Sequence, residues 1–361
     1  MTSRRVAASP DGSLPPSLQA IPAASADDLW AQPLLCIPGL LRSFGVSVEA
    51  VARQTGISPA ILHDPNNRVS FVDIGRLLME CSSATGRPHF GLLAGQQSGV
   101  AAVGVAGVLA RHSVSVRHAL RVIMTHLHLH DRGAVLTLRK RSHREVELAY
   151  AIHHPDTPGA RHIADGALAI EMQFLQAFCG PRWTPVEVTF AFDRPRDTSA
   201  YRKVFGAPVR FNAARFAIAF RTSWLDRPIA GADPRERTRL AKLVTELEGS
   251  RLTSMTERTR EALGHVLIAA PPSVDRIARV LGLSRRTLNR RLAQEGSSVK
   301  ALLEDARGAL ARQLLEETRM PVSEIAVALN YTTPSAFSRA FRKWAGGVSP
   351  RQFRTASAAD D

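Results

Sequence analysis

The sequence predicts a protein of two domains, in which a mixed α and β domain is followed by an all-α domain with two helix-turn-helix units. Three observations support this fold class. The chain has 361 residues, which is enough for more than one hydrophobic core. Its middle part alternates apolar and polar residues as strands do, and a helical pattern near the C-terminus occurs twice. Positive charge is concentrated in this repeated part of the chain, because residues 272–354 contain 15 Lys and Arg but only 7 Asp and Glu.

The net charge of the whole chain is +15, although its apolar content of 45% and charged content of 22% are ordinary for a soluble protein. A phosphate-rich partner is the first explanation, and an arginine-rich genome composition is the alternative. The sequence contains no run of 18 apolar residues and no apolar signal-peptide region, so we expect a cytoplasmic protein without a membrane segment. Cys36, Cys81 and Cys179 fit no metal-binding spacing, and we expect reduced core thiols and no cofactor or metal.

Residues 1–32 are rich in Pro, Ser and Ala without a sustained period, and we expect a disordered tail. A helix is expected from 34 to 44. The next segment, 48–62, imitates a helix-turn-helix, but its second part carries Pro59, Ala60 and Ile61 where a DNA reader needs hydrogen-bond donors. We interpret that segment as core packing.

Residues 71–130 are expected to be mainly helical. The glycine-rich patch 99–107 lacks the arrangement of a phosphate-binding loop, so close helix packing is the favoured interpretation. The segment 125–131 reads THLHLHD, which places His126 and His130 on one helix face or all three histidines on one strand face. Without a HExxH motif or a nearby thiolate, we favour exposed or core-edge histidines at a helix end over a metal site.

Alternation then predicts a β-hairpin from strands beginning at Val135 and Glu145, a helix over 163–178, and further strands near 186, 208 and 216. Residues 33–228 therefore form the predicted α and β domain, which is large enough to enclose a small-molecule pocket. No catalytic constellation stands out in it. Residues 229–258 are expected to be a linker, with a polar helix over 233–248 that serves as a connection or a dimer contact.

The repeated module begins at Ser273. Three apolar positions of the first unit, Ile277, Ala278 and Leu281, have apolar counterparts 48 residues later in the second unit. After the turn the spacing between corresponding positions becomes 49 residues, so that Leu288 corresponds to Phe337. One extra residue in the second turn explains this change. The sequence thus predicts two helix-turn-helix units joined by an apolar-periodic helix through Leu302, Leu303, Ala306, Leu310 and Leu314.

The second helix of each unit has an apolar face and a face of hydrogen-bond donors. In the second unit, a helix beginning near Pro334 turns its apolar residues inward, namely Ala336, Phe337, Ala340, Phe341 and Trp344, and turns Ser335, Ser338, Arg339 and Arg342 outward. In the first unit Arg286, Asn289 and Arg290 face outward. Arginine pairs with guanine and asparagine with adenine in the major groove, so two such helices about 34 Å apart could read successive groove segments.

Residues 259–356 resemble the DNA-binding domain of the AraC/XylS family of bacterial transcription regulators. The motif that carries this resemblance ends the second unit and consists of Phe341, Arg342, Lys343, Gly346, Ser349 and Pro350, followed by Phe353 and Arg354. The resemblance implies base-reading roles for Arg286, Asn289, Arg290, Ser335, Ser338 and Arg339. Arg285 and Arg342 are our added candidates for phosphate contacts.

Two departures from the family pattern bear on these roles. The family usually has Gly-Phe where this chain has Asn330-Tyr331, although asparagine tolerates a left-handed turn conformation. A second glycine, Gly347, lengthens the loop before Ser349 and affects the docking of the last helix.

Residues 33–228 resemble more loosely the arabinose-binding-type effector domain of the subgroup that includes ornithine and virulence regulators. The two resemblances together imply a ligand-responsive transcription factor that binds double-stranded promoter DNA. Activation by recruiting RNA polymerase is the family expectation, and repression is an alternative. A homodimer through the N-terminal domain or the 234–248 helix is plausible on the same grounds. The resemblance identifies neither the effector nor its contacts.

Two other classes of function remain open at this point. One is an enzyme targeted to DNA, such as a repair protein that accepts a methyl group on Cys36, Cys81 or Cys179, although the sequence offers none of these thiols an evident base. The other is a ligand-independent DNA-binding protein of the nucleoid type.

Overall fold

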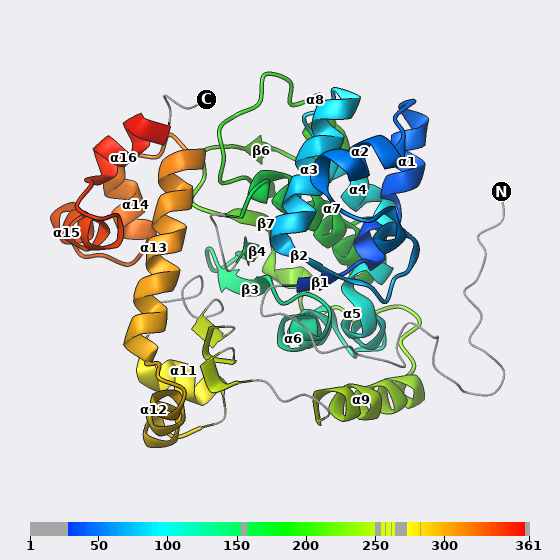
Figure 1. The fold of residues 1–361 in the computed structure, drawn as a ribbon. Helices are drawn as coiled ribbons and strands as arrows, with labels where there is room; N and C mark the ends of the chain where they lie inside the picture. Colours follow the sequence, from blue (N-terminus) through cyan, green and yellow to red (C-terminus); the bar gives the residue numbers. More distant parts are fainter. Residues whose placement is uncertain are drawn as a thin grey trace.

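The computed structural model describes residues 28–152, 157–249, 254–256, 258–260, 262–263, 273–281 and 283–357. An N-terminal domain of helices around a sheet is followed by a C-terminal helical domain, coloured yellow to red in Figure 1. The predicted fold class is therefore confirmed. Most of the predicted tail lies outside the described residues. Its boundary at residue 32 is nevertheless wrong, because strand β1 (Asp28–Trp30) pairs with β2 (Arg68–Ser70) and already belongs to the fold.

The segment between β1 and β2 is a small helical layer. It contains η2 (Gln32–Leu34), α1 (Ile37–Ser43), α2 (Val48–Thr55) and η3 (Pro59–His63). The segment that imitates a helix-turn-helix has only the short 3₁₀ turn η3 as its second part, and Val51 and Leu62 are buried in the domain core. The interpretation as core packing is confirmed.

The next segment is helical, as predicted. It comprises α3 (Phe71–Thr85), α4 (Phe90–Ser98), η4 (Val100–Val103), α5 (Gly104–Arg111), α6 (Val116–His126) and η5 (Leu127–Leu129). In the glycine-rich patch, Gly104 has a φ of +57°, and a Cβ on it would lie 2.9 Å from Nδ1 of His130. Close packing thus accounts for this glycine, since a side chain there would collide with the imidazole ring.

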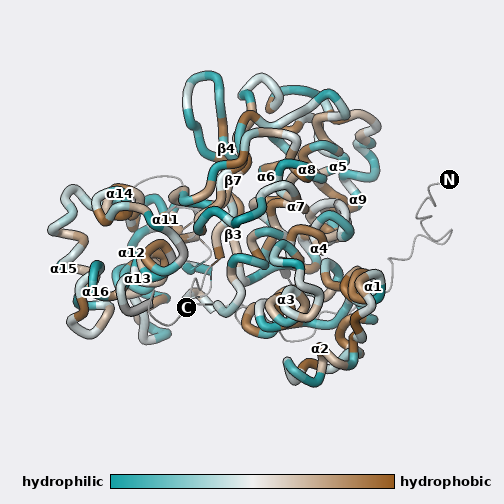
Figure 2. The backbone as a smooth tube through the Cα atoms, turned by 90° about the horizontal axis from the view of Figure 1, so that it is seen from above, coloured by the Kyte–Doolittle hydropathy of each residue, from teal (hydrophilic) through white to brown (hydrophobic). Residues whose placement is uncertain are grey.

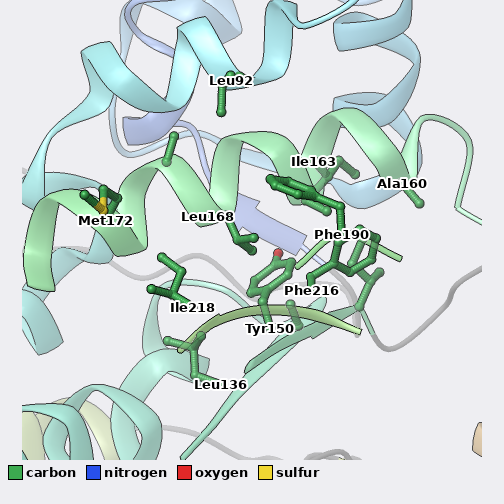
Figure 3. Close-up of a cluster of buried hydrophobic side chains, with 14 of the residues drawn as sticks. Leu92, Leu136, Tyr150, Ala160, Ile163, Leu168, Met172, Phe190, Phe216 and Ile218 are labelled. Atoms are coloured by element: carbon green, nitrogen blue, oxygen red, sulfur yellow. The ribbon is translucent and has the colours of Figure 1, made fainter. Parts of the chain in front are cut away.

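The five-stranded sheet is formed by β3 (Ala134–Lys140), β4 (Glu145–Ile152), β5 (Glu187–Thr189), β6 (Val209–Arg210) and β7 (Phe216–Arg221). Its strand order is β3-β4-β7-β5-β6, and only the β5–β6 pair is parallel. The long helix α7 (Ala160–Cys179) packs against β4 and β7. Figure 3 shows Leu168 of α7 lying over Tyr150 and Ile218 of the sheet. The predicted hairpin, helix and strands are all present.

An aromatic cluster adjoins the end of the sheet near α8 (Ser199–Phe205). Phe190 is at its centre, with its ring centroid 5.1 Å from that of Tyr201 and 5.5 Å from that of Phe211. The 3₁₀ turn η6 (Thr222–Trp224) follows β7. In Figure 2 the backbone labelled β4 and β7 is largely brown, whereas the outermost loop beyond it is teal, so apolar residues concentrate where the strands meet α7.

The polar helix expected over 233–248 is α9 (Pro234–Gly249). Its apolar side chains Leu240, Leu243 and Val244 are buried against Val105 and Leu109 of α5. The apolar face of α9 is therefore used within the chain, and a dimer contact through this helix would have to involve its polar faces.

Candidate DNA-reading surface

The two helix-turn-helix units have the same backbone construction. The first consists of α11 (Val274–Val280) and α12 (Arg285–Gln294), and the second of α14 (Val322–Ala328) and α15 (Pro334–Trp344). In the first turn the Leu283 amide donates to the Ala278 carbonyl at 2.8 Å, and in the second turn the Tyr331 amide donates to the Ala326 carbonyl at 2.9 Å. These pairs are 48 residues apart, which agrees with the repeat read from the sequence.

The start of each second helix explains the change of offset from 48 to 49. Ser284 caps α12 by accepting from the Thr287 amide, and Thr333 caps α15 by accepting from the Ala336 amide, both at 3.1 Å. The caps are 49 residues apart, so the inserted residue is Thr332. Asn330 has a φ of +62° and occupies the left-handed position where the family usually has glycine.

Each unit buries apolar side chains beneath the exposed face of its second helix, and those of the second unit belong to the same buried cluster as the core of the N-terminal domain. In the first unit Ile277, Leu288 and Leu292 are fully buried with Ala278 and Leu302 in one cluster. The second unit has an aromatic core, in which Phe337 and Phe341 are fully buried, with ring centroids 5.8 Å apart. These anchors fix the rotation of α12 and α15, and therefore determine which side chains face solvent.

The side chains predicted to read DNA lie on the outward faces of these two helices. Arg285, Arg286, Asn289 and Arg290 of α12 are exposed, as are Ser335, Arg339 and Arg342 of α15, whereas Ser338 is half-buried. None of these five arginines forms an ion pair with a described residue. Their guanidinium groups are therefore available to a partner.

Helix α13 (Val299–Glu317) joins the units and belongs to both cores. Its first turn contributes Val299 and Leu302 to the first core, and its last turns pack Leu314 and Leu315 with the second unit. Nineteen helical residues span about 28 Å. Figure 1 shows the units at opposite ends of this helix.

The last helix, α16 (Pro350–Ser357), docks despite the extra glycine in the loop before it. Gly347 takes a φ of +98°, which glycine adopts without strain, and its amide donates to the Arg342 carbonyl at 2.7 Å. Phe353 then packs edge-on against Phe341 at a ring centroid distance of 5.3 Å, and Arg354 donates to the Leu315 carbonyl.

The histidine segment gains no support as a metal site. His126 and His128 are half-buried at the end of α6, but His130 is fully enclosed, and burial lowers the pKa of its imidazole to about 3. Within the described part of the chain, no group of three His, Cys, Asp or Glu residues could hold a metal ion. Among the described helices, none is long and apolar enough to cross a bilayer.

A contact between the domains was not predicted. Arg319, in the connection between α13 and α14, donates from Nε to Asp193 Oδ2 at 2.7 Å, and its backbone amide donates to Asn212 Oδ1 at 2.9 Å. These are isolated polar residues in surface loops, and nothing in their sequence surroundings signals that they meet.

Comparisons with known proteins agree with this architecture. Residues 45–229 match the family described as the arabinose-binding domain of AraC transcription regulators, and residues 277–356 match a helix-turn-helix domain family. The ornithine utilization regulator of Pseudomonas aeruginosa is 29% identical over 88% of this chain and 93% of its own. The transcriptional regulator VirS of Mycobacterium tuberculosis is also 29% identical, over 87% of this chain and 93% of its own.

Among solved structures, the transcriptional regulator CdpR of Pseudomonas aeruginosa aligns with 90% of this chain and 97% of its own, with a TM-score of 0.43 and 24% identity.

An α and β domain joined to tandem helix-turn-helix units defines a transcription regulator that binds DNA. Within that class, the chain belongs to the AraC-type regulators that carry an arabinose-binding N-terminal domain. The N-terminal domain is thus a ligand-binding type of domain, and the C-terminal domain is the DNA-binding part.

Proposed function

We propose that this protein regulates transcription by reading two successive major-groove segments of a promoter with α12 and α15. The observation that carries this proposal is the matched pair of exposed donor faces at the two ends of α13. In this proposal Arg286, Asn289 and Arg290 read bases in one segment, and Ser335, Ser338 and Arg339 read bases in the next. Arg285 and Arg342 contact phosphates.

The chemistry of these side chains supports this division of roles. Arginine donates two hydrogen bonds to guanine, asparagine exchanges two with adenine, and serine can bond to either bases or phosphates. A guanidinium at the edge of the reading face instead meets the sugar-phosphate backbone, which positions the protein without reading sequence. The length of α13, about 28 Å, approaches the 34 Å of one turn of B-DNA.

We further propose that a small molecule bound to the N-terminal domain modulates this binding. We also propose that the protein acts in the cytoplasm as an activator that recruits RNA polymerase, and that it forms a homodimer. Modulation requires that the effector bind the DNA-competent arrangement more tightly than the other. Support for an effector comes from the family of the N-terminal domain and from a relative named for ornithine utilization.

The state of the three cysteines favours a regulator over a methyl-accepting enzyme. Burial raises the pKa of the Cys81 and Cys179 thiols to about 12, and burial also raises that of Cys36. A thiol with a raised pKa carries little thiolate at neutral pH and is a poor nucleophile. The described surroundings of these residues therefore do not activate them.

Substitution of single arginines tests the division of roles. Arg339→Ala should cost about 1–3 kcal/mol of binding at the specific site and relax base preference there, because a bidentate base contact is lost. Arg342→Ala should instead weaken binding to all duplexes alike and flatten the dependence of affinity on salt. The measurement is a fluorescence titration of cognate and random duplexes at several salt concentrations, after the cognate site has been selected from genomic fragments.

Arg53→Ala is the matched control, because it removes the same side chain from an exposed position on α2. It should leave both affinities unchanged. Equal losses on cognate and random duplex for Arg339→Ala would contradict a base-reading role for that residue.

A further inference from the structure

The N-terminal domain contains a pocket of about 90 Å³ between α7, the helices α3 and α4, and the β3–β4 hairpin. Its walls are mainly apolar and include Phe71, Ile74, Leu136, Ile163 and Phe174. Figure 3 shows the Tyr150 side chain pointing from the sheet toward α7, the helix that carries Ile163. A cavity of about 150 Å³ holds one benzene molecule, so this cavity suits a molecule of about four non-hydrogen atoms.

Two acidic or basic side chains in the cavity wall have unused hydrogen-bonding atoms. Glu171 of α7 is 2% exposed, and neither of its carboxyl oxygens forms a hydrogen bond with a described residue. His130 is 4% exposed, and its Nε2 likewise has no partner among the described residues. A buried carboxyl without a partner is costly, and its retention at a cavity wall points to a ligand that supplies the partner.

The other polar groups of the wall already have partners. Ser98 donates to the Pro33 carbonyl at 2.7 Å, and Asp131 accepts from the backbone amides of Gly133 and Ala134. The Tyr150 hydroxyl is hydrogen-bonded to Asp131. Glu171 is therefore the acidic group in the wall that is left to bind a ligand.

The charges of the wall favour a basic ligand. The cavity is lined by Glu171 and Asp131, and the described residues that line it include no Lys or Arg. An anionic ligand would meet no Lys or Arg side chain among these lining residues. An amino acid would bring a carboxylate for which the wall offers no cation.

We propose that this cavity is the effector site of the regulator and that it binds a short aliphatic amine, whose nitrogen pairs with Glu171 while its carbon chain lies against the apolar wall. The proposal rests on the proposed function, because it identifies the site and the chemical class of the modulating molecule.

A proton transfer makes this binding compatible with the mainly apolar cavity. Burial raises the pKa of Glu171 well above its usual value, which favours the protonated carboxyl in the cavity. A neutral amine that enters the cavity accepts this proton, which gives an ammonium ion beside a carboxylate. No net charge has to be desolvated in the process.

The test is isothermal titration of the full-length protein with the series from methylamine to hexylamine, and with 1-butanol and butyrate as neutral and anionic counterparts. We expect the tightest binding for propylamine or butylamine, and weaker binding for butanol and butyrate. Glu171→Gln should weaken butylamine binding by at least about tenfold, because it removes the proton donor and the counter-charge. Glu49→Gln, at an exposed position of α2, should not change it.

The variant Ala167→Leu provides a second test, because Ala167 lines the cavity and a larger side chain would fill it. Butylamine binding should then be lost. Equal butylamine affinity in the wild type and in Glu171→Gln, or tighter binding of butyrate than of butylamine, would overturn the proposal.

A DNA titration separates the cavity proposal from the proposed function. If butylamine binds through Glu171 and shifts the affinity for the selected duplex, the site is the effector site. If butylamine binds but the duplex affinity stays the same, the effector role is refuted. If the protein binds no duplex specifically, the proposed function fails. The titration with amines still shows in that case whether the cavity binds amines.

Discussion

Asp165 of α7 is a fully buried carboxyl group whose ionisation is linked to folding. The Tyr201 hydroxyl donates to its Oδ2 at 2.9 Å, and Oδ1 has no partner among the described residues. Burial raises the pKa of this carboxyl to about 7, against an opposing effect of Arg161 and of the hydrogen bond from Tyr201. The unfolded chain would have a value of about 4. Between these values the folded protein holds a proton that the unfolded chain releases.

The stabilising effect of this proton is complete below about pH 4 and is lost as the pH rises to about 7. Asp165→Asn removes the titration but keeps an oxygen that accepts from Tyr201. The unfolding free energy of the variant relative to wild type should therefore rise by up to about 1.4 kcal/mol per pH unit between pH 4 and 7. Urea unfolding at several pH values measures it.

Asp197→Asn is the control for this experiment. Hydrogen bonds from the Ser199 amide and hydroxyl lower the pKa of the exposed Asp197 carboxyl, so its pH effect should have the opposite sign. Parallel pH profiles of the wild type and Asp165→Asn would contradict the raised pKa.

At the residue level, the sequence predicted the exposed donors but not the buried acids. Arg286 and Arg339 follow from helical periodicity, because their position relative to the apolar stripe is fixed along one helix. The left-handed turn at Asn330 was also foreseeable from residue type, and it is confirmed. Asp165 and Glu171 could not be singled out, because their burial depends on segments distant in the sequence.

Among the elements, α4 and α7 make a close contact that involves glycines on both helices. A Cβ on Gly95 would lie 2.3 Å from the Gly166 carbonyl oxygen, and one on Gly91 would lie 2.0 Å from the His162 carbonyl oxygen. These helices touch through their backbones, so a side chain at either position would force them apart.

Gly95→Ala should destabilise the protein by about 1–3 kcal/mol, as expected when a tightly packed contact is overfilled. The control is Gly39→Ala in α1, where a Cβ would lie 4.0 Å from the Arg42 side chain. There the helical preference of alanine should stabilise by about 0.5–1 kcal/mol. Urea unfolding measures both changes. A neutral effect of Gly95→Ala would mean that α4 and α7 can separate at little cost.

The elements themselves were largely predictable. The hairpin of β3 and β4, the helix α7 and the six helices from α11 to α16 follow from periods that are visible in a single segment. Two contacts between elements were not predictable: the pairing of β4 with β7 and the glycine contact of α4 with α7. Such contacts depend on the three-dimensional path of the chain between distant segments. The glycine-rich patch at 99–107 drew attention, but the tightest contacts involve isolated glycines such as Gly75 and Gly91.

At the scale of the whole molecule, Arg319 links the DNA-binding domain to the N-terminal domain. Its side chain is 85% exposed and that of Asp193 is 45% exposed, and such surface ion pairs contribute about 1 kcal/mol or less. The ion pair by itself is therefore too weak to fix the relative position of the two domains.

Arg319→Ala should change the effect of an effector on DNA affinity by no more than about fivefold, which corresponds to that energy. The double variant with Asp193→Ala should show no further change, since either substitution already breaks the pair. Duplex titrations with and without butylamine measure both. Arg202→Ala, an exposed residue of α8, is the control. A double variant whose effect equals the sum of the two single effects would show that the residues act independently.

Domain order and the tandem repeat were predictable at this scale because each leaves a local pattern in composition or period. The contact of Arg319 with Asp193 and Asn212 leaves no such pattern in the sequence, because each partner is a single polar residue in a loop. The position of the N-terminal boundary was missed for a related reason: β1 has only three residues and is recognisable only when its partner β2 is known.

Helix α13 has a consequence for the promoters that such a regulator can serve. Because both units are packed onto one continuous helix, adding or removing one residue would rotate one unit by about 100° relative to the other. Adding one base pair to the DNA would turn the second box by only about 34°. Under the proposed reading of two groove segments, a single-step change in one molecule cannot be compensated by a single-step change in the other. The protein could then change which bases it recognises far more readily than the distance between the two segments.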